Sequence, residues 1–170
     1  MNVKNLSNNH LALIGIGSNI DPEKNICRAV QALSQSVEIL ACSKVWQNPA
    51  VGSDGPDYLN AAIKIRSPLS RKELKYDVLL PLEMELERVR TKNKNADRTI
   101  DLDILIFDEE NIDEEIWTAA HVSIPCAEIM PQLTHPQTRE TLKEAASRLQ
   151  PGENFFVRED LDLCVLYSKN

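Results

Sequence analysis

The stretch Leu11-Ala-Leu-Ile-Gly-Ile-Gly-Ser-Asn-Ile-Asp-Pro22 decides how the fold begins, because it reads as a strand, a turn and a helix start in direct succession. The apolar run over 11–17 predicts a strand that ends in glycines. Asp21 is a typical N-cap residue, and Pro22 suits the first position of a helix. We expect that helix to bury one face, since apolar residues recur at helical spacing at Ile26, Ala29, Val30 and Leu33.

Further segments downstream read as strands, a loop and a helix. We expect strands over Glu38–Trp46, Tyr58–Ile65 and Thr99–Phe107, and a loop rich in turn formers over 48–57. The segment Ser70-Arg-Lys-Glu73 has the pattern of a capping box and predicts a helix start. Pro81 interrupts the pattern of that helix, so we expect a kink or an early end there.

The order of these elements predicts the fold class. The order β-α-β-β-α-β is that of a ferredoxin-like fold, an α+β fold in which helices pack on one face of an antiparallel sheet. We expect a further helix from about Thr138 to Leu149 and a last strand from Leu161 to Tyr167. Many functions occur on this fold, so the function has to be argued from the site residues.

Length, charge and cysteine content narrow the class of protein. We interpret the 170 residues as one domain over 1–170, and the net charge of −7 argues against a nucleic-acid partner, which needs a basic surface. The chain has no membrane-length apolar run and no signal-peptide pattern at its polar start, so we expect a soluble, cytoplasmic protein without membrane contact. Nothing in the sequence indicates a partner protein. We expect reduced, mostly buried thiols at Cys27, Cys42, Cys126 and Cys164, because the four are far apart.

Two carboxylates stand out in the strand predicted over Thr99–Phe107. Asp101 and Asp103 are two residues apart, so their side chains point to the same side of the strand, roughly 7 Å apart at the base. A pair of this kind suits two Mg²⁺ ions that neutralise phosphates during in-line transfer. The same alternation also occurs in an ordinary strand with one solvated face, so the pair alone leaves both interpretations open. The opposite face of the strand is apolar and carries Ile100, Leu102, Ile104 and Ile106.

A basic segment lies directly before these carboxylates. The stretch Glu87–Arg98 has a local net charge of +3 in an acidic chain, and its cations are Arg88, Arg90, Lys92, Lys94 and Arg98. A polyphosphate site needs such cations beside its metal ions, whereas a solvated basic loop is the alternative on composition alone. The acidic run Asp108–Glu115 follows the strand, and the repulsion between its charges predicts an exposed loop.

The spacing of the glycines and histidines does not match other known nucleotide-binding or metal-binding motifs. The segment Gly15-Ile-Gly17 lacks the third glycine of a dinucleotide-binding turn and the Lys-Ser/Thr of a P-loop. The histidines His10, His121 and His135 are too far apart in sequence to form a ligand pattern.

Four segments together resemble the 6-hydroxymethyl-7,8-dihydropterin pyrophosphokinase family of folate biosynthesis. They are Ala12-Leu-Ile-Gly-Ile-Gly-Ser-Asn19, Asn48-Pro-Ala-Val-Gly52, Pro56-Asp-Tyr-Leu-Asn-Ala-Ala62, and Arg88-Val-Arg90 followed by Arg98-Thr-Ile-Asp-Leu-Asp-Ile-Leu105. The resemblance implies an enzyme that binds ATP, two Mg²⁺ ions and a dihydropterin. It also implies transfer of the diphosphoryl group of ATP to the hydroxymethyl oxygen of the pterin.

The resemblance also implies a role for each matched residue. Asp101 and Asp103 would hold the two Mg²⁺ ions, and Arg88 and Arg98 would stabilise the transferring group as catalytic residues. The ATP contacts would come from Glu83, Arg90, Arg98 and Ile104. The pterin contacts would come from Asn48, Pro49, Val51, Tyr58 and Asn60, with one aromatic face stacking on the ring and one amide bonding its edge.

The chain departs from the family pattern at several positions. Asn95 replaces a tryptophan of the loop before the Asp pair, Ala96-Asp97 replaces a Gly-Pro, and Glu87 replaces a glycine. After Ile124-Pro125 the family continues with a histidine and an Arg-x-Phe segment, whereas Cys126 follows here and 127–136 resemble a later family segment. An alternative alignment gives the histidine and arginine roles to His135 and Arg139. The tail Gly152–Asn170 has no counterpart.

These departures leave two functions open. The first is an active ATP-dependent dihydropterin diphosphokinase, and the alternative is a weak or inactive homologue that binds nucleotide or pterin in a regulatory or partner role. Formation of AMP from ATP would distinguish them. Since the second pterin-stacking aromatic is missing, we expect pterin binding to be weakened about five- to a hundred-fold unless another ring takes its place. Trp117 is the favoured candidate over Phe155 and Phe156, because it follows the Asp strand.

Overall fold

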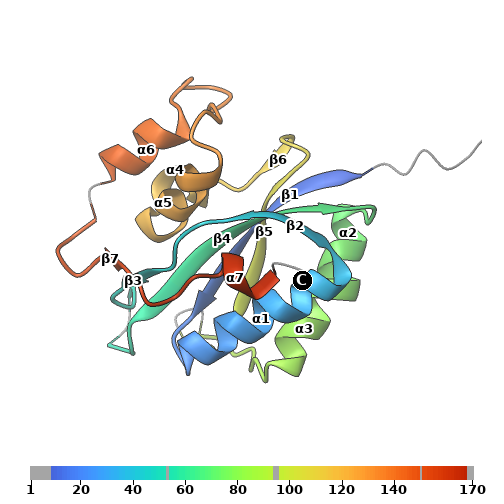
Figure 1. The fold of residues 1–170 in the computed structure, drawn as a ribbon. Coiled ribbons are helices and arrows are strands. Elements are labelled where there is room, and N and C mark those ends of the chain that lie inside the picture. The colour runs from blue at the N-terminus through green and yellow to red at the C-terminus, as the bar shows by residue number, and fades with distance from the viewer. Residues whose placement is uncertain (1–8, 53, 94–95, 150, 168–170) are drawn as a thin grey trace, which may run out of the picture.

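The protein is built on a single antiparallel sheet, seen in a computed structural model that describes residues 9–52, 54–93, 96–149 and 151–167. The strand order is β6-β5-β1-β4-β3-β7, and β2 also pairs with β4 (Figure 1). The predicted α+β class with a ferredoxin-like sheet is confirmed. The strands are β1 (His10–Ser18), β2 (Glu38–Cys42), β3 (Trp46–Asn48), β4 (Tyr58–Ser67), β5 (Asp101–Phe107), β6 (Asn111–Ile112) and β7 (Phe156–Val157).

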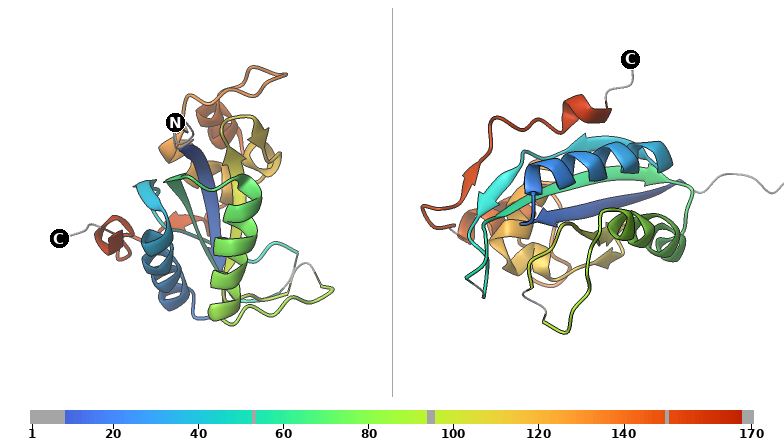
Figure 2. Two further views of the ribbon diagram at one scale, coloured as in Figure 1. Left: turned by 90° about the vertical axis from the view of Figure 1, so that its right-hand side faces the viewer. Right: turned by 90° about the horizontal axis from the view of Figure 1, so that it is seen from below.

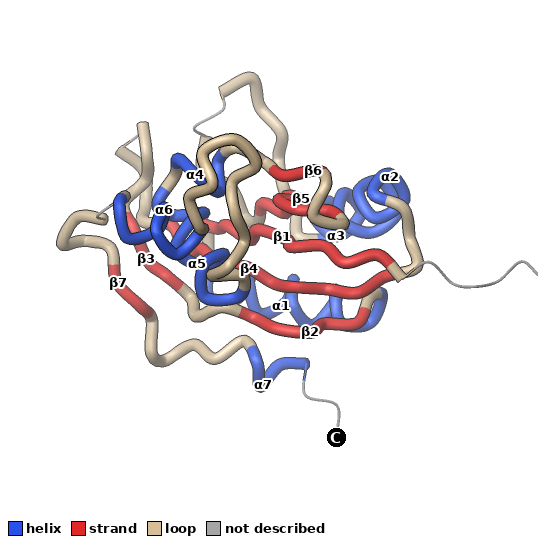
Figure 3. The backbone as a smooth tube through the Cα atoms, turned by 90° about the horizontal axis from the view of Figure 1, so that it is seen from above, coloured by secondary structure: helices blue, strands red, loops and turns tan. Residues whose placement is uncertain are grey.

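Helices cover both faces of this sheet, whereas the element order predicted helices on one face. On the first face lie α1 (Pro22–Ser36), α2 (Arg71–Glu73), a π-helical turn η1 (Leu74–Leu79) and α3 (Leu80–Glu85), with α7 (Cys164–Tyr167) beside α1. On the second face lie α4 (Glu115–Thr118), α5 (Ala120–Ile129) and α6 (Leu142–Arg148). Seen from below, α1 and α3 lie across the sheet on the viewer's side (Figure 2), and from above α4, α5 and α6 cover only part of the strands (Figure 3).

Each face has its own hydrophobic core. The first core joins α1, η1 and α3 to the sheet through fully buried side chains such as Leu33, Leu74 and Ile63. The second core joins α4, α5 and α6 to the sheet through Trp117, Cys126, Leu142 and their neighbours. None of the helices in the described part of the chain is both long and apolar enough to cross a membrane. No disulfide links the four cysteines; Cys126 is buried, Cys27 and Cys42 are half-buried, and Cys164 is exposed.

A β-bulge in β5 changes the side of the sheet on which Ile106 lies. The pairing of β1 with β5 shifts between Leu13, opposite Ile106, and Ile14, opposite Ile104. The extra residue, Leu105, joins the second core together with the next residue, Ile106. The prediction that Ile106 shares a face with Ile100, Leu102 and Ile104 is therefore wrong, while the other three lie in the first core as expected.

The first half of the chain agrees with the sequence in most elements. Helix α1 begins at Pro22 and buries the four predicted apolar positions, although Asp21 adopts a left-handed conformation (φ 42°) and makes no side-chain cap bond. The capping box of Ser70 and Glu73 is confirmed. The strand predicted over 38–46 is split into β2 and β3, because the backbone of Lys44 donates to the Glu128 carboxylate instead of to a strand.

Pro81 does not end its helix early. The helix continues to Glu85, and the wider π-helical turn directly precedes the proline. In that turn the backbone N–H of Leu80 donates to the carbonyl of Lys75, five residues back. Pro81 has no backbone N–H to donate, and the wider spacing of the π-helical turn lets the helix continue past it.

The second half of the chain departs further from the predictions. The helix expected from Thr138 is shorter and begins at Leu142, where Thr141 and Glu144 form a second capping box. The strand expected over Leu161–Tyr167 is wrong: Cys164–Tyr167 is a helix, with the Asp162 carboxylate accepting from the Cys164 N–H at 2.8 Å. The acidic run is exposed as predicted at 108–110 and 113–115, but Asn111–Ile112 forms the short strand β6.

Candidate functional site

A pocket of about 530 Å³ lies between the second face of the sheet and helices α4 and α5. The floor comes from β1 and β4, one end comes from Asp101, Asp103 and Arg98, and the other end comes from the loop after β3. Seven of the residues assigned to ligands from the resemblance line it together: Asn48, Val51, Tyr58, Asn60, Arg98, Asp101 and Asp103.

Two glycines of β1 keep the floor of this pocket flat. A Cβ atom added at Gly17 would lie 3.0 Å from Oδ1 of Asn60, and one added at Gly15 would lie 2.8 Å from Leu105 Cδ1. Side chains at either position would therefore enter the space beside Asn60 or displace Leu105. The glycines that end the predicted strand leave room for a flat ligand.

The amide end of the pocket is held by hydrogen bonds between β3 and β4. Asn60 and Asn48 are both buried, and Nδ2 of Asn60 donates to Oδ1 of Asn48 at 2.6 Å. Nδ2 of Asn48 donates to the carbonyl of Pro49 at 2.8 Å. Tyr58 lines the pocket beside them, and burial raises the pKa of its phenol. Pro49 is exposed and does not line the pocket.

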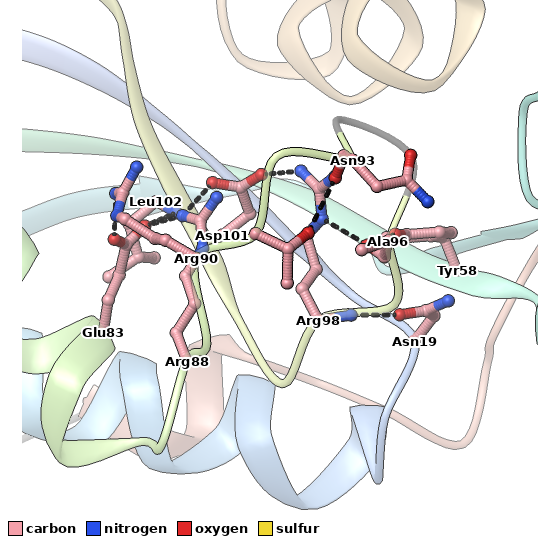
Figure 4. Close-up of polar contacts among 11 residues, drawn as sticks. Asn19, Tyr58, Glu83, Arg88, Arg90, Asn93, Ala96, Arg98, Asp101 and Leu102 are labelled. Atoms are coloured by element: carbon pink, nitrogen blue, oxygen red, sulfur yellow. Dashed lines mark hydrogen bonds and ion pairs between the residues drawn. The ribbon is translucent and has the colours of Figure 1, made fainter.

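The charged end is a network of ion pairs around Asp101. Its two carboxylate oxygens are bound by different guanidinium groups, Oδ1 by Arg88 and Oδ2 by Arg98 (Figure 4). Arg88 also binds Glu83, whose side chain is only 2% exposed. The second oxygen of Glu83 accepts from Arg90 at 2.6 Å, and its first accepts from the Leu102 N–H at 2.9 Å. Glu83 thus aligns Arg88 and Arg90 beside the strand that carries Asp101.

Asp103 lies next to Asp101 on the pocket face of β5. Asp103 is open to the pocket, but partial loss of solvation around its carboxylate, followed by the negative charges of Asp101 and Glu83, raises its pKa to about 6. A cation between the two aspartates would relieve this repulsion, and carboxylate oxygens are the ligands that Mg²⁺ prefers. No group of three or more His, Cys, Asp or Glu suited to a metal is found among the described residues, so water and phosphate oxygens would have to complete the coordination.

Some predicted site residues lie elsewhere. Ile104 is buried in the first core, on the face of β5 opposite the pocket. Lys92 is exposed on the loop before β5, and Lys94 and Asn95 lie outside the described residues.

Sequence reasoning missed the helical wall of the pocket. That wall carries Glu115, Thr118, Ala119, His121 and Val122, from α4 and the first turn of α5. Burial lowers the pKa of His121 below its usual value and so favours the neutral form of its imidazole. The signal for these residues was weak, because the predicted acidic loop ran directly into a segment with little helical periodicity.

None of the rings expected to replace the missing aromatic lines the pocket, so the expectation for Trp117 is wrong. Trp117 is buried in the second core and packs edge-on against His135, with ring centroids 5.1 Å apart. Phe155 packs on Trp46 at 5.2 Å, and Phe156 lies exposed on β7. His135 and Arg139, which the alternative alignment placed in the histidine and arginine roles, do not line the pocket either.

The family model for 7,8-dihydro-6-hydroxymethylpterin-pyrophosphokinase (HPPK) matches residues 13–132. The relatives of this chain include proteins named 2-amino-4-hydroxy-6-hydroxymethyldihydropteridine pyrophosphokinase. The protein of Bacillus subtilis is 35% identical over 89% of this chain and 99% of its own, and that of Synechocystis is 32% identical over 78% of this chain and 73% of its own. That of Campylobacter jejuni is 40% identical over 64% of this chain and 69% of its own. With the pocket and the Asp101–Asp103 pair in the matched region, the chain belongs to the 7,8-dihydro-6-hydroxymethylpterin-pyrophosphokinase family.

Proposed function

We propose that this chain transfers the diphosphoryl group of ATP to the hydroxymethyl oxygen of 6-hydroxymethyl-7,8-dihydropterin, a step of folate biosynthesis. One observation carries the proposal: a single pocket joins an amide and aromatic end, suited to a flat heterocycle, to a carboxylate and guanidinium end, suited to polyphosphate. The family membership supports the same reaction.

The amide end would bind the pterin. The flat floor at Gly15 and Gly17 allows close approach of a fused ring, and the phenol ring of Tyr58 offers a stacking face. Asn60 keeps one side-chain N–H free of its bond to Asn48, so it can bond the polar edge of the ring. Asn48 and Val51 would complete this end of the pocket.

The charged end would bind the phosphates of ATP. Asp101 and Asp103 would hold two Mg²⁺ ions, whose charge would offset that of the phosphates when bound. Arg88 and Arg98 would leave the Asp101 carboxylate for phosphate oxygens, where guanidinium groups form strong bidentate contacts. Glu83 would keep Arg88 and Arg90 aligned throughout, because its carboxylate is buried and bound to both.

The proposed reaction needs no covalent intermediate with the protein. The hydroxymethyl oxygen forms a bond to the β-phosphorus of ATP, and the bond from that phosphorus to the oxygen bridging to the α-phosphate breaks. AMP leaves with the bridging oxygen, and the hydroxyl proton passes to solvent. Arg88 and Arg98 would stabilise the charge that develops on the transferred group, and the pocket would align the two substrates.

The test is formation of AMP by the full chain mixed with ATP, Mg²⁺ and the hydroxymethyl pterin. We expect AMP and pterin diphosphate in equal amounts, and no AMP with a 6-methyl pterin, which lacks the attacking oxygen. Binding of ATP and pterin without AMP would contradict the proposal and favour the inactive homologue.

We further propose that the reaction takes place in the cytoplasm, where the absence of disulfides among the four cysteines fits a reducing compartment.

A further inference from the structure

The C-terminal segment 155–163 borders the pterin end of the pocket although it contributes no lining residue. We propose that Arg158, together with strand β7, is a positioning element that holds β3 and so fixes Asn48 for pterin binding. This inference rests on the proposed function, because it assigns the segment to the substrate side of the same reaction.

Strand β3 needs support from outside because it is short. It comprises three residues, and on one side it pairs with the first residues of β4. On its other side, Trp46 pairs with Val157 and Gln47 pairs with Phe156. The backbone N–H of Arg158 extends this pairing by donating to the Val45 carbonyl at 2.9 Å. Without β7, β3 would be an edge strand with unpaired backbone groups.

The side chain of Arg158 joins three parts of the fold. Its Nη1 donates to Glu23 at the start of α1 at 3.0 Å and to Oε1 of Gln47 on β3 at 3.2 Å. Its Nε and Nη2 bind the Asp160 carboxylate at 2.9 and 2.7 Å, and the side chain is 21% exposed. The planar guanidinium group of Arg158 thus donates to three acceptors at once. This arrangement holds β3 in place more strictly than one exposed ion pair would.

Gln47 connects Arg158 to the pocket residue Asn48. Its side chain is bound at both ends, with Oε1 accepting from Arg158 and Nε2 donating to Asp57 at 2.9 Å, directly before β4. The next residue is Asn48, whose Oδ1 accepts from Asn60 in the pocket at 2.6 Å. Arg158 therefore acts on the two pocket amides through one intervening residue.

The second wall of the pocket is tied to the same short segment. The Glu128 carboxylate on α5 accepts from the Lys44 N–H at 2.7 Å and from the Trp46 indole at 3.0 Å. Phe155 packs on the same indole. The segment 44–48 is thus held between α5 and the C-terminal segment, whereas the ion pairs around Asp101 involve neither.

This arrangement predicts that removal of Arg158 weakens the binding of the pterin and leaves the binding of ATP unchanged. We expect Arg158→Ala to raise the KM for the pterin about tenfold, the scale on which loss of a supporting residue weakens a bound ligand, while the KM for ATP stays unchanged. Arg158→Lys retains a cation for Glu23 or Asp160 but not the three-way fork, so we expect an intermediate KM for the pterin. Arg66→Ala is the matched control, because it removes an ion pair with Glu38 between β2 and β4 at the far end of the sheet.

Steady-state kinetics with each substrate varied in turn, together with thermal melting of each variant, decides the matter. An equal rise in both KM values, or a pterin effect in Arg66→Ala as large as in Arg158→Ala, would overturn the inference. If the wild type forms no AMP, the proposed function fails, and titration of pterin fluorescence replaces kinetics. Weaker pterin binding by Arg158→Ala than by wild type then supports the positioning role, and equal binding, or none by the wild type, refutes it.

Discussion

Gly17 allows a test of the pocket floor with a single added carbon. A Cβ atom there would lie 3.0 Å from Oδ1 of Asn60, tighter than ordinary contact, so Gly17→Ala should displace the Asn60 amide. We expect pterin affinity to fall about tenfold, or about 1.4 kcal/mol, with ATP affinity unchanged. Titration of pterin fluorescence measures the change. Gly152→Ala is the control, because a Cβ there meets no atom within 4 Å; equal pterin affinities in both variants would mean that the ring does not lie over Gly17.

Arg98 and Arg88 both bind the Asp101 carboxylate. Removal of Arg98 should therefore have opposite effects on the affinity for Mg²⁺ and on turnover. Arg98→Ala should free one Asp101 oxygen and raise the affinity for Mg²⁺ without nucleotide by roughly tenfold, since a nearby positive charge is lost. The same variant should lower turnover by orders of magnitude and weaken ATP binding far less, if Arg98 acts mainly on the transition state.

Calorimetric titration with Mg²⁺ and with an ATP analogue, beside turnover, measures both effects. Arg90→Ala is the matched variant, because Arg90 pairs with Glu83 rather than with Asp101, and it should leave the affinity for Mg²⁺ alone unchanged. Lower Mg²⁺ affinity in Arg98→Ala would contradict the expected competition for Asp101. Equal losses of turnover and of ATP binding would assign Arg98 to ground-state binding.

His121 gives the helical wall a dependence on pH. Burial lowers the pKa of this imidazole in the folded protein, so the unfolded chain binds its proton at a higher pH. Stability from this group is therefore complete above the ordinary histidine pKa of about 6.5 and is lost as the pH falls below it. His121→Gln should flatten the fall in the free energy of unfolding between about pH 7 and 5. Urea unfolding at several pH values tests this, and the same pH slope in both proteins would refute it.

At the scale of elements, the sequence predicted what local signals determine. The alternation over the first residues of β5 and the spacing in α1 gave correct elements, because Ile100, Leu102 and Ile104 share one core and α1 buries one face. The bulge at Leu105 depends on the pairing of β5 with β1, which is distant in sequence, so local patterns did not predict it. In the tail, where a strand was expected over Leu161–Tyr167, Leu163 and Leu166 are three residues apart and pack against the first core at helical spacing.

In the site, too, residues in sequence motifs were predicted, whereas residues placed by the packing of distant segments were not. The matched motifs predicted seven residues that meet in the pocket, from Asn48 to Asp103, because the antiparallel register of β1 with β4 and β5 brings them to one face. The wall from α4 and α5 was missed because only the second core places it over the sheet. Ile104 was assigned to ATP from the resemblance, yet its side chain faces the first core.

The two cores divide the whole molecule into parts with different roles. The first core supports the network of Glu83 and Arg88, and the second supports the helical wall of the pocket. Because the second core is smaller and covers only part of the sheet, we infer that it opens more readily than the first.

Matched substitutions of two fully buried leucines test this difference. Leu142→Ala, in the second core, and Leu33→Ala, in the first, should each cost about 2–5 kcal/mol in the free energy of unfolding. Leu142→Ala should speed amide hydrogen exchange mainly over residues 115–148 and weaken pterin binding more than ATP binding, because the wall loosens while the ion pairs stay in place. Leu33→Ala should instead speed exchange across the sheet and α1 together. Hydrogen exchange followed by mass spectrometry makes the comparison, and the same pattern in both variants would mean that the two layers unfold as one unit.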